Sequence, residues 1–273
     1  MTDDLFLEAS GPWGGRARIG TTTRRGGVSR GPYATLNLGR GVGDDPAAVT
    51  ENRRRLVRAL DLPGEPCWLR QVHGTRVVRM TAGSVPDTEE ADGAWTDEAG
   101  VVLAVLTADC VPVVFHAPDR GRLAVAHAGW RGFARGVLEA TLAACGGGGA
   151  ETRAWIGPAI DAAAYEVGPE VRAACLARCP SGSDDFRSTR GDRLTLDLPA
   201  LVARHLAALD VGRVIASGRS TAEADLFYSY RREGRTGRQA TLAWTVASPE
   251  GGGVAPGPHA GTLKPRTRGP TIR

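Results

Sequence analysis

Apolar residues recur at helical spacing in four segments of the chain, so each segment is expected to bury one face of a helix. The first segment opens at Asp45 and Pro46, because a short acidic side chain caps a helix and proline fits its first turn. The predicted helices run from Pro46 to about Leu60, from Trp130 to the glycine run at 146–149, from Pro169 to Cys179, and from Pro199 to Leu209.

Short β-rich runs lie between these helices, and several of them follow one another directly. This order lacks strict β–α–β alternation, so it favours a layered α/β (α+β) domain with mixed sheets over a doubly wound sheet. The predicted strands are Cys67–Val72, Thr75–Thr81, Val101–Leu106, Val111–Phe115, Leu123–Ala126, Ala154–Ile156, Val214–Ala216 and Thr241–Val246.

The chain of 273 residues divides into a patterned body and a Gly/Pro-rich end. We expect one domain over 1–247 and a flexible basic tail over 248–273, where the periodicity is lost. The tail carries a net charge of +3 out of the chain's formal +4, which leaves the body nearly neutral. A nearly neutral body does not indicate a nucleic-acid-binding surface.

The remaining composition excludes several other classes of protein. The acidic start lacks the features of a signal peptide, and no apolar run reaches 18 residues, so we expect a cytoplasmic protein with no membrane span. Five cysteines without a C-x-x-C pair indicate free thiols rather than a disulfide framework. We expect a monomer or a small homo-oligomer.

Three residues with metal-binding chemistry end predicted strands: His73, Cys110 and His127. Two imidazoles and a thiolate make a plausible three-ligand zinc site with one open position. The same residues fit a Cys110 nucleophile with a histidine base, and each is also compatible with a buried structural role. We interpret the other cysteines and His116, His205 and His259 as structural or incidental.

Arginines provide the candidate anion sites. Arg131 falls in the first turn of a predicted helix beside two glycines, where an oxyanion or phosphate is favoured. Arg231 belongs to a basic cluster over residues 230–238, which also fits a solvated hairpin. Gly39–Gly43 is not a dinucleotide-binding loop, because Asp44 and Asp45 would repel a pyrophosphate.

Many short motifs in one order resemble the YfiH-like family, also called the laccase-domain or polyphenol oxidase family. The resemblance extends from Ile19 to Val246. The motifs are Thr23–Ser29, Leu36–Gly39, Val42–Asp44, Glu51–Arg53, Gln71–Gly74, Ala91–Gly93, Thr107–Pro112, His127–Gly132, Ile156–Ile160, Tyr165–Gly168, Tyr228–Arg232 and Thr236–Arg238.

The resemblance implies a core similar to the catalytic domain of cytotoxic necrotizing factors, with zinc on His73, Cys110 and His127. It also implies a purine nucleoside phosphorylase that acts on adenosine, inosine, guanosine or methylthioadenosine and deaminates adenosine. A copper-dependent polyphenol oxidase and a peptidoglycan-precursor editing factor are the alternatives, and a metal-free Cys–His hydrolase is a minor one.

Further roles follow as hypotheses for this activity. Asp109 is a possible proton carrier, or it only holds the turn at the end of its strand. We expect phosphate or substrate to be bound by Arg131, Arg24, Asn37 or Arg231.

Two positions depart from the family pattern. Ser220 stands where many relatives carry cysteine, which puts a redox or disulfide role of that position in doubt but leaves the three metal ligands intact. Tyr228 replaces a common phenylalanine.

Overall fold

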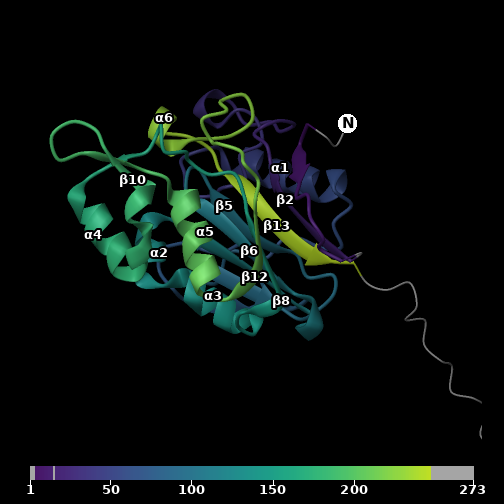
Figure 1. Ribbon diagram of the computed structural model, residues 1–273. Coiled ribbons are helices and arrows are strands. Elements are labelled where there is room, and N and C mark those ends of the chain that lie inside the picture. The colour runs from purple at the N-terminus through teal and green to yellow at the C-terminus, as the bar shows by residue number, and fades with distance from the viewer. Residues whose placement is uncertain (1–3, 15, 247–273) are drawn as a thin grey trace, which may run out of the picture.

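Two β-sheets lie face to face between two groups of helices in the computed structural model, which describes residues 4–14 and 16–246. Figure 1 shows α3, α4 and α5 on one side of the sheets and α1 on the other. The predicted tail at 248–273, with His259, lies outside the described residues. The helices are α1 (Pro46–Ala59), α2 (Trp130–Arg135), α3 (Val137–Cys145), α4 (Pro169–Arg178), α5 (Leu198–Ala208) and α6 (Tyr230–Glu233).

The larger sheet has six strands in the order β12, β8, β6, β7, β4 and β3. Its outer pairs, β12 with β8 and β3 with β4, are parallel, whereas the central pairs are antiparallel. The strands are β3 (Val77–Arg79), β4 (Gly93–Thr96), β6 (Val111–Ala117), β7 (Arg122–Ala128), β8 (Gly149–Ile156) and β12 (Val211–Ala216).

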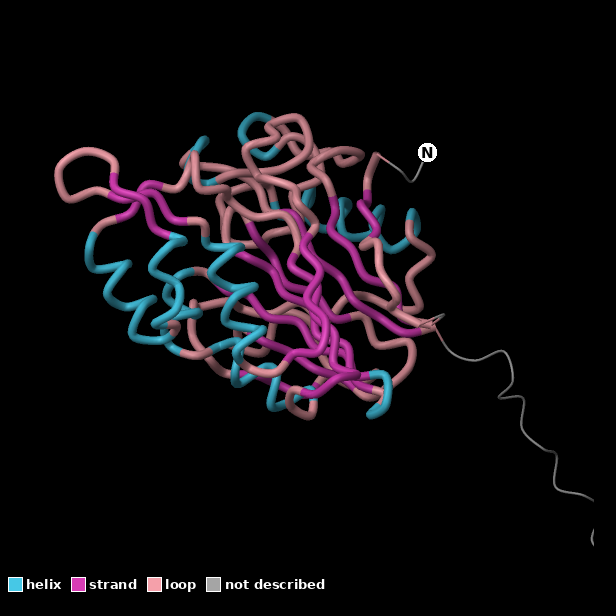
Figure 2. The backbone as a smooth tube through the Cα atoms, in the orientation of Figure 1, coloured by secondary structure: helices cyan, strands magenta, loops and turns pink. Residues whose placement is uncertain are grey.

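The second sheet has four antiparallel strands in the order β1, β2, β13 and β5. A three-stranded sheet, in the order β10, β11 and β9, lies apart from the two larger ones (Figure 2). The strands of these sheets are β1 (Phe6–Glu8), β2 (Ala17–Thr22), β5 (Leu103–Thr107), β13 (Gln239–Thr245), β9 (Glu166–Val167), β10 (Phe186–Ser188) and β11 (Leu194–Leu196).

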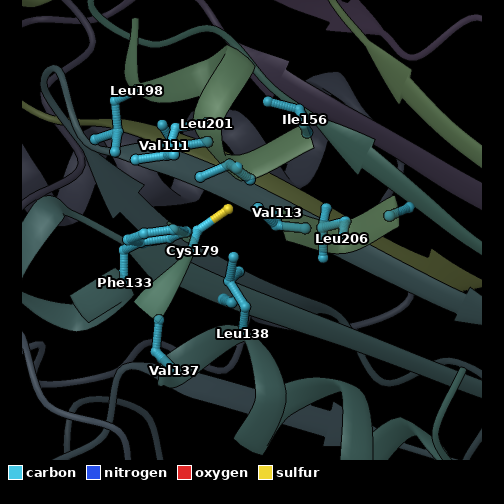
Figure 3. Close-up of a cluster of buried hydrophobic side chains, with 14 of the residues drawn as sticks. Val111, Val113, Phe133, Val137, Leu138, Ile156, Cys179, Leu198, Leu201 and Leu206 are labelled. Atoms are coloured by element: carbon cyan, nitrogen blue, oxygen red, sulfur yellow. The ribbon is translucent and has the colours of Figure 1, made fainter. Parts of the chain in front are cut away.

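Alternation along the strands divides the interior into separate layers. In β6, Val111, Val113 and Phe115 face the helices, whereas Val114 faces the second sheet. Figure 3 shows the helix-side cluster, where side chains of α2, α3 and α5 meet β6. The second sheet buries its outer face against α1, with Leu56 and Leu242 in the same buried cluster. Because side chains alternate across a strand, one sheet supplies two cores.

The mixed α/β prediction is confirmed, and all four predicted helices exist, with one correction. The helix predicted from Trp130 is broken into α2 and α3 at Gly136, whose φ of 98° is left-handed. The strand predicted at Cys67–Val72 is wrong: only single bridges form, at Cys67 and Arg70. The apolar residues of this segment are buried in two different cores, and this burial, rather than pairing in a sheet, explains the pattern. Among the described residues, none of the helices is long and apolar enough to cross a membrane.

Candidate metal centre and the cavity around it

Three side chains that are distant in the sequence form one cluster. The ligand atoms of His73, Cys110 and His127 all lie within 4.8 Å of one another, and His73 Nε2 is 3.9 Å from Cys110 Sγ. Cys110 directly precedes β6 and His127 lies in β7, whose pairing with β6 brings both residues to the same end of the sheet. His73 enters from a loop with a left-handed φ of 59°. The structure therefore brings together the three residues predicted as metal ligands.

Asp92, a residue without an assigned role in the sequence analysis, organises this cluster. Its carboxylate is fully buried and lies 2.8 Å from His127 Nδ1. It also accepts hydrogen bonds from the backbone N–H groups of Val72, His73 and Gly74. One carboxylate thus orients one imidazole and fixes the loop that carries the other, which is how a second layer of residues supports metal ligands. The motif Ala91–Gly93 was the only signal for it in the sequence.

The cluster favours a thiolate at neutral pH. Burial alone would raise the pKa of the Cys110 thiol, but the charges and hydrogen bonds of His127 and His73 outweigh burial and lower that pKa to about 6. Burial acts to lower the pKa of His127, yet Cys110 and Asp92 raise it to about 9. The thiolate is the form of cysteine that binds metals and that attacks electrophiles.

The space around the three donors fits a metal ion. A Cβ atom at Gly129 would lie 2.8 Å from Cys110 Sγ and 3.1 Å from His73 Cδ2, so only glycine leaves room for the present arrangement. Because Asp92 occupies Nδ1 of His127, Nε2 is the nitrogen left for a ligand bond. Two imidazoles and one thiolate form a donor set typical of zinc, and copper also binds such ligands.

A cavity of about 880 Å³ opens onto the cluster. Its wall carries the aromatic rings of Trp130, Tyr165 and Tyr230, of which Tyr230 is 61% exposed. Arginines supply most of the charge, so the cavity suits an anionic or phosphate-bearing ligand. The arginines that line it are Arg40, Arg70, Arg131, Arg231 and Arg238.

Asp109 lies in the cavity wall and already holds two other segments of the chain. Its carboxylate accepts a hydrogen bond of 2.7 Å from the Thr221 hydroxyl and another of 2.7 Å from the backbone N–H of Arg231. Its φ of 103° is left-handed, at the turn between β5 and β6. This geometry agrees with the structural interpretation, and proton transfer by Asp109 stays a prediction.

The four predicted substrate-binding residues separate into two groups. Arg131 and Arg231 line the cavity, where each guanidinium lies over an aromatic ring, Arg131 over Trp130 at 4.4 Å and Arg231 over Tyr165 at 5.1 Å. Arg131 lies in the first turn of α2, as predicted, but α2 has only six residues and is much shorter than the helix predicted behind this anion site.

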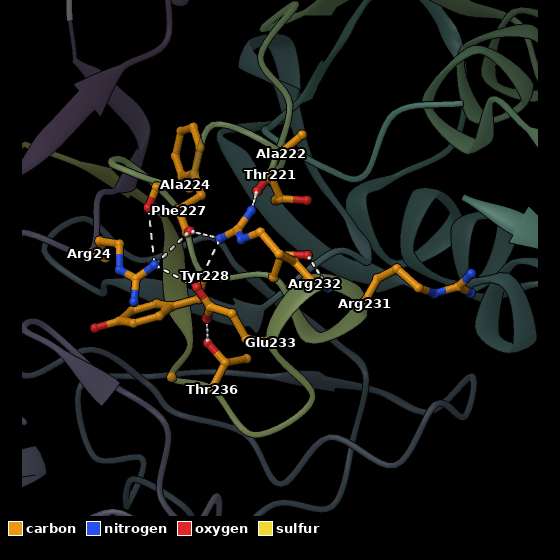
Figure 4. Close-up of polar contacts among 12 residues, drawn as sticks. Arg24, Thr221, Ala222, Ala224, Phe227, Tyr228, Arg231, Arg232, Glu233 and Thr236 are labelled. Carbon is orange, nitrogen blue, oxygen red and sulfur yellow. Dashed lines mark hydrogen bonds and ion pairs between the residues drawn. The ribbon is translucent and has the colours of Figure 1, made fainter. Parts of the chain in front are cut away.

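Arg24 and Asn37 do not line the cavity. Arg24 bonds Glu233 at 2.8 Å and lies over the Tyr228 ring, and Figure 4 shows Arg231 pointing away from that group. Asn37 is fully buried and bonds backbone groups. The geometry therefore gives both residues structural contacts rather than contact with a ligand in the cavity.

The two departures from the family pattern lie outside the metal cluster. Ser220 bonds the carboxylate of Asp161, and its backbone forms a bridge with Ala159. Tyr228 donates its hydroxyl to the backbone oxygen of Tyr33 at 2.7 Å, a bond that phenylalanine would lack.

Known proteins similar to this chain cover nearly all of its body. A purine nucleoside phosphorylase of Pseudomonas aeruginosa is 44% identical over 243 residues, which are 88% of this chain and 98% of the relative. The purine nucleoside phosphorylase YfiH of Escherichia coli is 43% identical over 227 residues, 83% of this chain and 93% of the relative. A solved Neisseria meningitidis structure matches with a TM-score of 0.83 and 41% identity, covering 89% of this chain and all of that one.

The family model for multi-copper polyphenol oxidoreductase laccase matches residues 18–246. Across the part of the chain that the structure describes, one cluster of three potential ligands is found, formed by His73, Cys110 and His127. The chain belongs to this laccase-domain family, which its relatives named YfiH share.

Proposed function

We propose that this protein is a zinc-dependent purine nucleoside phosphorylase, with adenosine deamination as a second activity of the same cavity. The observation that carries the proposal is the opening of a cavity lined by arginines and aromatic rings onto the cluster of His73, Cys110 and His127. The names of the relatives in Pseudomonas aeruginosa and Escherichia coli agree with it.

Phosphorolysis needs a phosphate ion and a nucleoside held together, with a phosphate oxygen facing the C1′–N9 bond. A phosphate oxygen forms a bond to C1′ of the ribose as the C1′–N9 bond breaks, and N9 takes a proton, which gives the free base and ribose 1-phosphate. Aromatic rings such as Trp130 and Tyr230 offer faces against which a purine stacks. The arginines of the cavity, Arg131 and Arg231 among them, supply the fork geometry that binds phosphate oxygens.

His73, Cys110 and His127 would hold the zinc ion. When bound, the ion supplies a Lewis acid that polarises a substrate oxygen or activates water. Asp92 fixes His127 in the tautomer that leaves Nε2 free and anchors the loop of His73, so the chain presents its donors in one arrangement. In the deamination, a water oxygen bonds to C6 of adenosine, the C6–N bond breaks, and ammonia leaves.

The copper-dependent oxidase is the first alternative, because thiolate and imidazole also bind copper. A multicopper oxidase needs several copper sites, and the described residues provide one cluster. The second alternative is the editing of peptidoglycan precursors, which predicts binding of a muramyl-peptide nucleotide with no turnover of nucleosides.

The test is an assay of the purified protein with inosine and phosphate for hypoxanthine and ribose 1-phosphate. The matched variants are Cys110→Ala, which removes the thiolate ligand, and Cys145→Ala, which removes a buried thiol that does not line the cavity. We expect the first to lose activity by at least about 100-fold and the second to keep it. Wild-type product no greater than that of Cys110→Ala would overturn the phosphorylase proposal.

Two further arms separate the alternatives. Metal analysis of protein purified without added metal distinguishes zinc from copper. Activity that survives treatment with a chelator would instead favour a metal-free hydrolase. Adenosine supplied without phosphate tests deamination, with inosine and ammonia as the expected products. Oxidation of a phenol in air, without nucleoside turnover, would favour the oxidase instead.

A further inference from the structure

We propose that Arg238 is the principal phosphate-binding residue of the cavity and that the buried hydroxyl of Thr107 completes this anion subsite. The inference rests on the proposed phosphorylase function for the identity of the anion, and on the geometry of the cavity for its place. Arg238 had no role in the sequence analysis beyond its membership of a motif and a basic cluster.

Arg238 differs in its partners from two other arginines of the cavity, Arg40 and Arg70. Arg40 and Arg70 form ion pairs with Asp87 and Glu90, at 3.7 and 3.0 Å. Within the described residues, Arg238 has no carboxylate at ion-pair distance. Its guanidinium donates from Nη1 to the backbone oxygens of residues 236 and 237.

This guanidinium is also partly withdrawn from water, unlike those of Arg131 and Arg231, which are exposed. Burial lowers the pKa of Arg238, although the nearby Cys110 and Asp109 act to raise it. A partly buried guanidinium without a carboxylate partner, in a cavity wall, suits a ligand of opposite charge.

Strand pairing places Arg238 at the cluster although it is distant in the sequence. Arg238 directly precedes β13, and its neighbour Gln239 pairs with Thr107 at the end of β5. Asp109 and Cys110 follow β5 after one intervening residue, and both act to raise the pKa of Arg238. Arg238 therefore faces the same cavity as the metal ligands.

Thr107 supplies a second, independent observation. Its side chain is 1% exposed and lines the cavity, and its Oγ1 atom has no hydrogen-bond partner among the described residues. Buried hydroxyl groups in folded proteins are nearly always bonded. An oxygen of a bound anion would accept a hydrogen bond from the Thr107 hydroxyl, while the guanidinium of Arg238 neutralises the charge of the anion.

The backbone around Arg238 is held by Asn37. Asn37 Oδ1 accepts from the backbone N–H groups of Arg238 and Gly39, at 2.9 and 3.0 Å. A Cβ atom at Gly39 would lie 2.7 Å from Cγ of Arg238, so glycine leaves the path for the arginine side chain. Asn37 is thus a positioning residue, which gives the buried asparagine of the predicted site a role through Arg238.

The experiment compares Arg238→Gln, Arg238→Lys and the control Arg54→Gln, whose arginine is paired with Glu51 on α1 and does not line the cavity. Calorimetry with inorganic phosphate alone measures binding without turnover. Phosphorolysis kinetics with either phosphate or inosine varied give the KM for each substrate separately. We expect Arg238→Gln to raise Kd and KM for phosphate about 10- to 100-fold, with the KM for inosine and the zinc content nearly unchanged. Arg238→Lys should recover part of the affinity, and Arg54→Gln should change it less than about twofold.

The two proposals fail in different ways. Phosphorolysis by Arg238→Gln with a wild-type KM for phosphate would overturn the subsite and leave the phosphorylase intact. Phosphate binding that Arg238→Gln abolishes, in a protein without phosphorolysis, would support the subsite and overturn the phosphorylase. No phosphate binding by the wild type, or equal losses in Arg54→Gln and Arg238→Gln, would also overturn the subsite. If Arg238→Gln does not fold, a wild-type phosphate Kd in Arg238→Lys and Thr107→Val would overturn it.

Discussion

Two histidine–carboxylate pairs in this protein have nearly the same local geometry and different surroundings. His127 bonds Asp92 at 2.8 Å, and His205 bonds Glu139 at 2.8 Å. Both histidines are buried, with 4% and 6% of the residue surface exposed. A search for paired histidines alone would not distinguish them.

Their remaining partners do distinguish them. The free nitrogen of His127 faces Cys110 and a cavity, and Asp92 also binds three backbone N–H groups of the loop with His73. In the other pair, Glu139 shares its oxygen with Arg178 at 3.2 Å, and the ring of His205 packs edge-on against Phe133. A histidine–carboxylate pair becomes a candidate site when further donor atoms and a cavity lie beside it, because a ligand needs both the donors and the space.

A third buried histidine lacks a carboxylate partner altogether within the described residues. His116 is 6% exposed, and its Nδ1 atom has no hydrogen-bond partner there. Burial, aided by the charge of Arg153, lowers the pKa of His116 to about 4, whereas the pKa of His127 rises to about 9. Burial acts in the same direction on both rings, so the neighbouring negative charges decide the outcome.

The largest expected difference between the two pairs is in metal binding. His127→Ala should lose the zinc ion and lower phosphorolysis by more than about 100-fold, because a ligand is removed. His205→Ala should keep zinc and activity and lose stability only. Zinc per chain and initial rates check this, and full zinc content in His127→Ala would show that the cluster is not the metal site.

Replacement of each carboxylate by the corresponding amide tests what Asp92 and Glu139 contribute to their histidines. Asp92→Asn should weaken zinc affinity by about 10- to 100-fold, since the amide cannot accept as a carboxylate does from His127 and the loop. Glu139→Gln, the matched change, should leave zinc affinity unchanged and lower the free energy of unfolding by about 1 kcal/mol. Competition with a chelator measures the affinity, and equal affinities in the two variants would contradict the role of Asp92.

The smallest expected effect concerns His116 and the pH dependence of stability. Its folded-state pKa, about 4, lies below the ordinary value of 6.5, so the unfolded chain takes up the proton first. Stability is therefore lost as the pH falls from about 6.5 toward 4, by up to about 2 kcal/mol at pH 5. His116→Gln should remove this part of the loss. Denaturant unfolding at pH 7 and pH 5 measures it, and identical losses in variant and wild type would refute the assignment.

Local pattern in the sequence predicted those features that depend on neighbours along the chain. The cap of α1 is one example, since Asp45 accepts from the N–H of Ala47 as its position before Pro46 indicates. The end of β7 with His127 and the turn between β5 and β6 with Cys110 are another, because alternation and turns are short-range properties. Gly136 shows the limit, since apolar spacing continues across the break between α2 and α3.

The spacing of His73, Cys110 and His127 along the chain does not by itself indicate that they form one cluster. The order of motifs predicted the cluster, because it shows the resemblance to a family that has these ligands. The tertiary structure decided the rest: the pairing of β6 with β7, the anchoring of the His73 loop by Asp92, and the placement of Arg238 by β13. It also shows that Arg24 and Asn37, two of the predicted binding residues, do not line the cavity. The reason is physical: contacts between distant strands follow from register and burial over the whole sheet, which no short window of sequence contains.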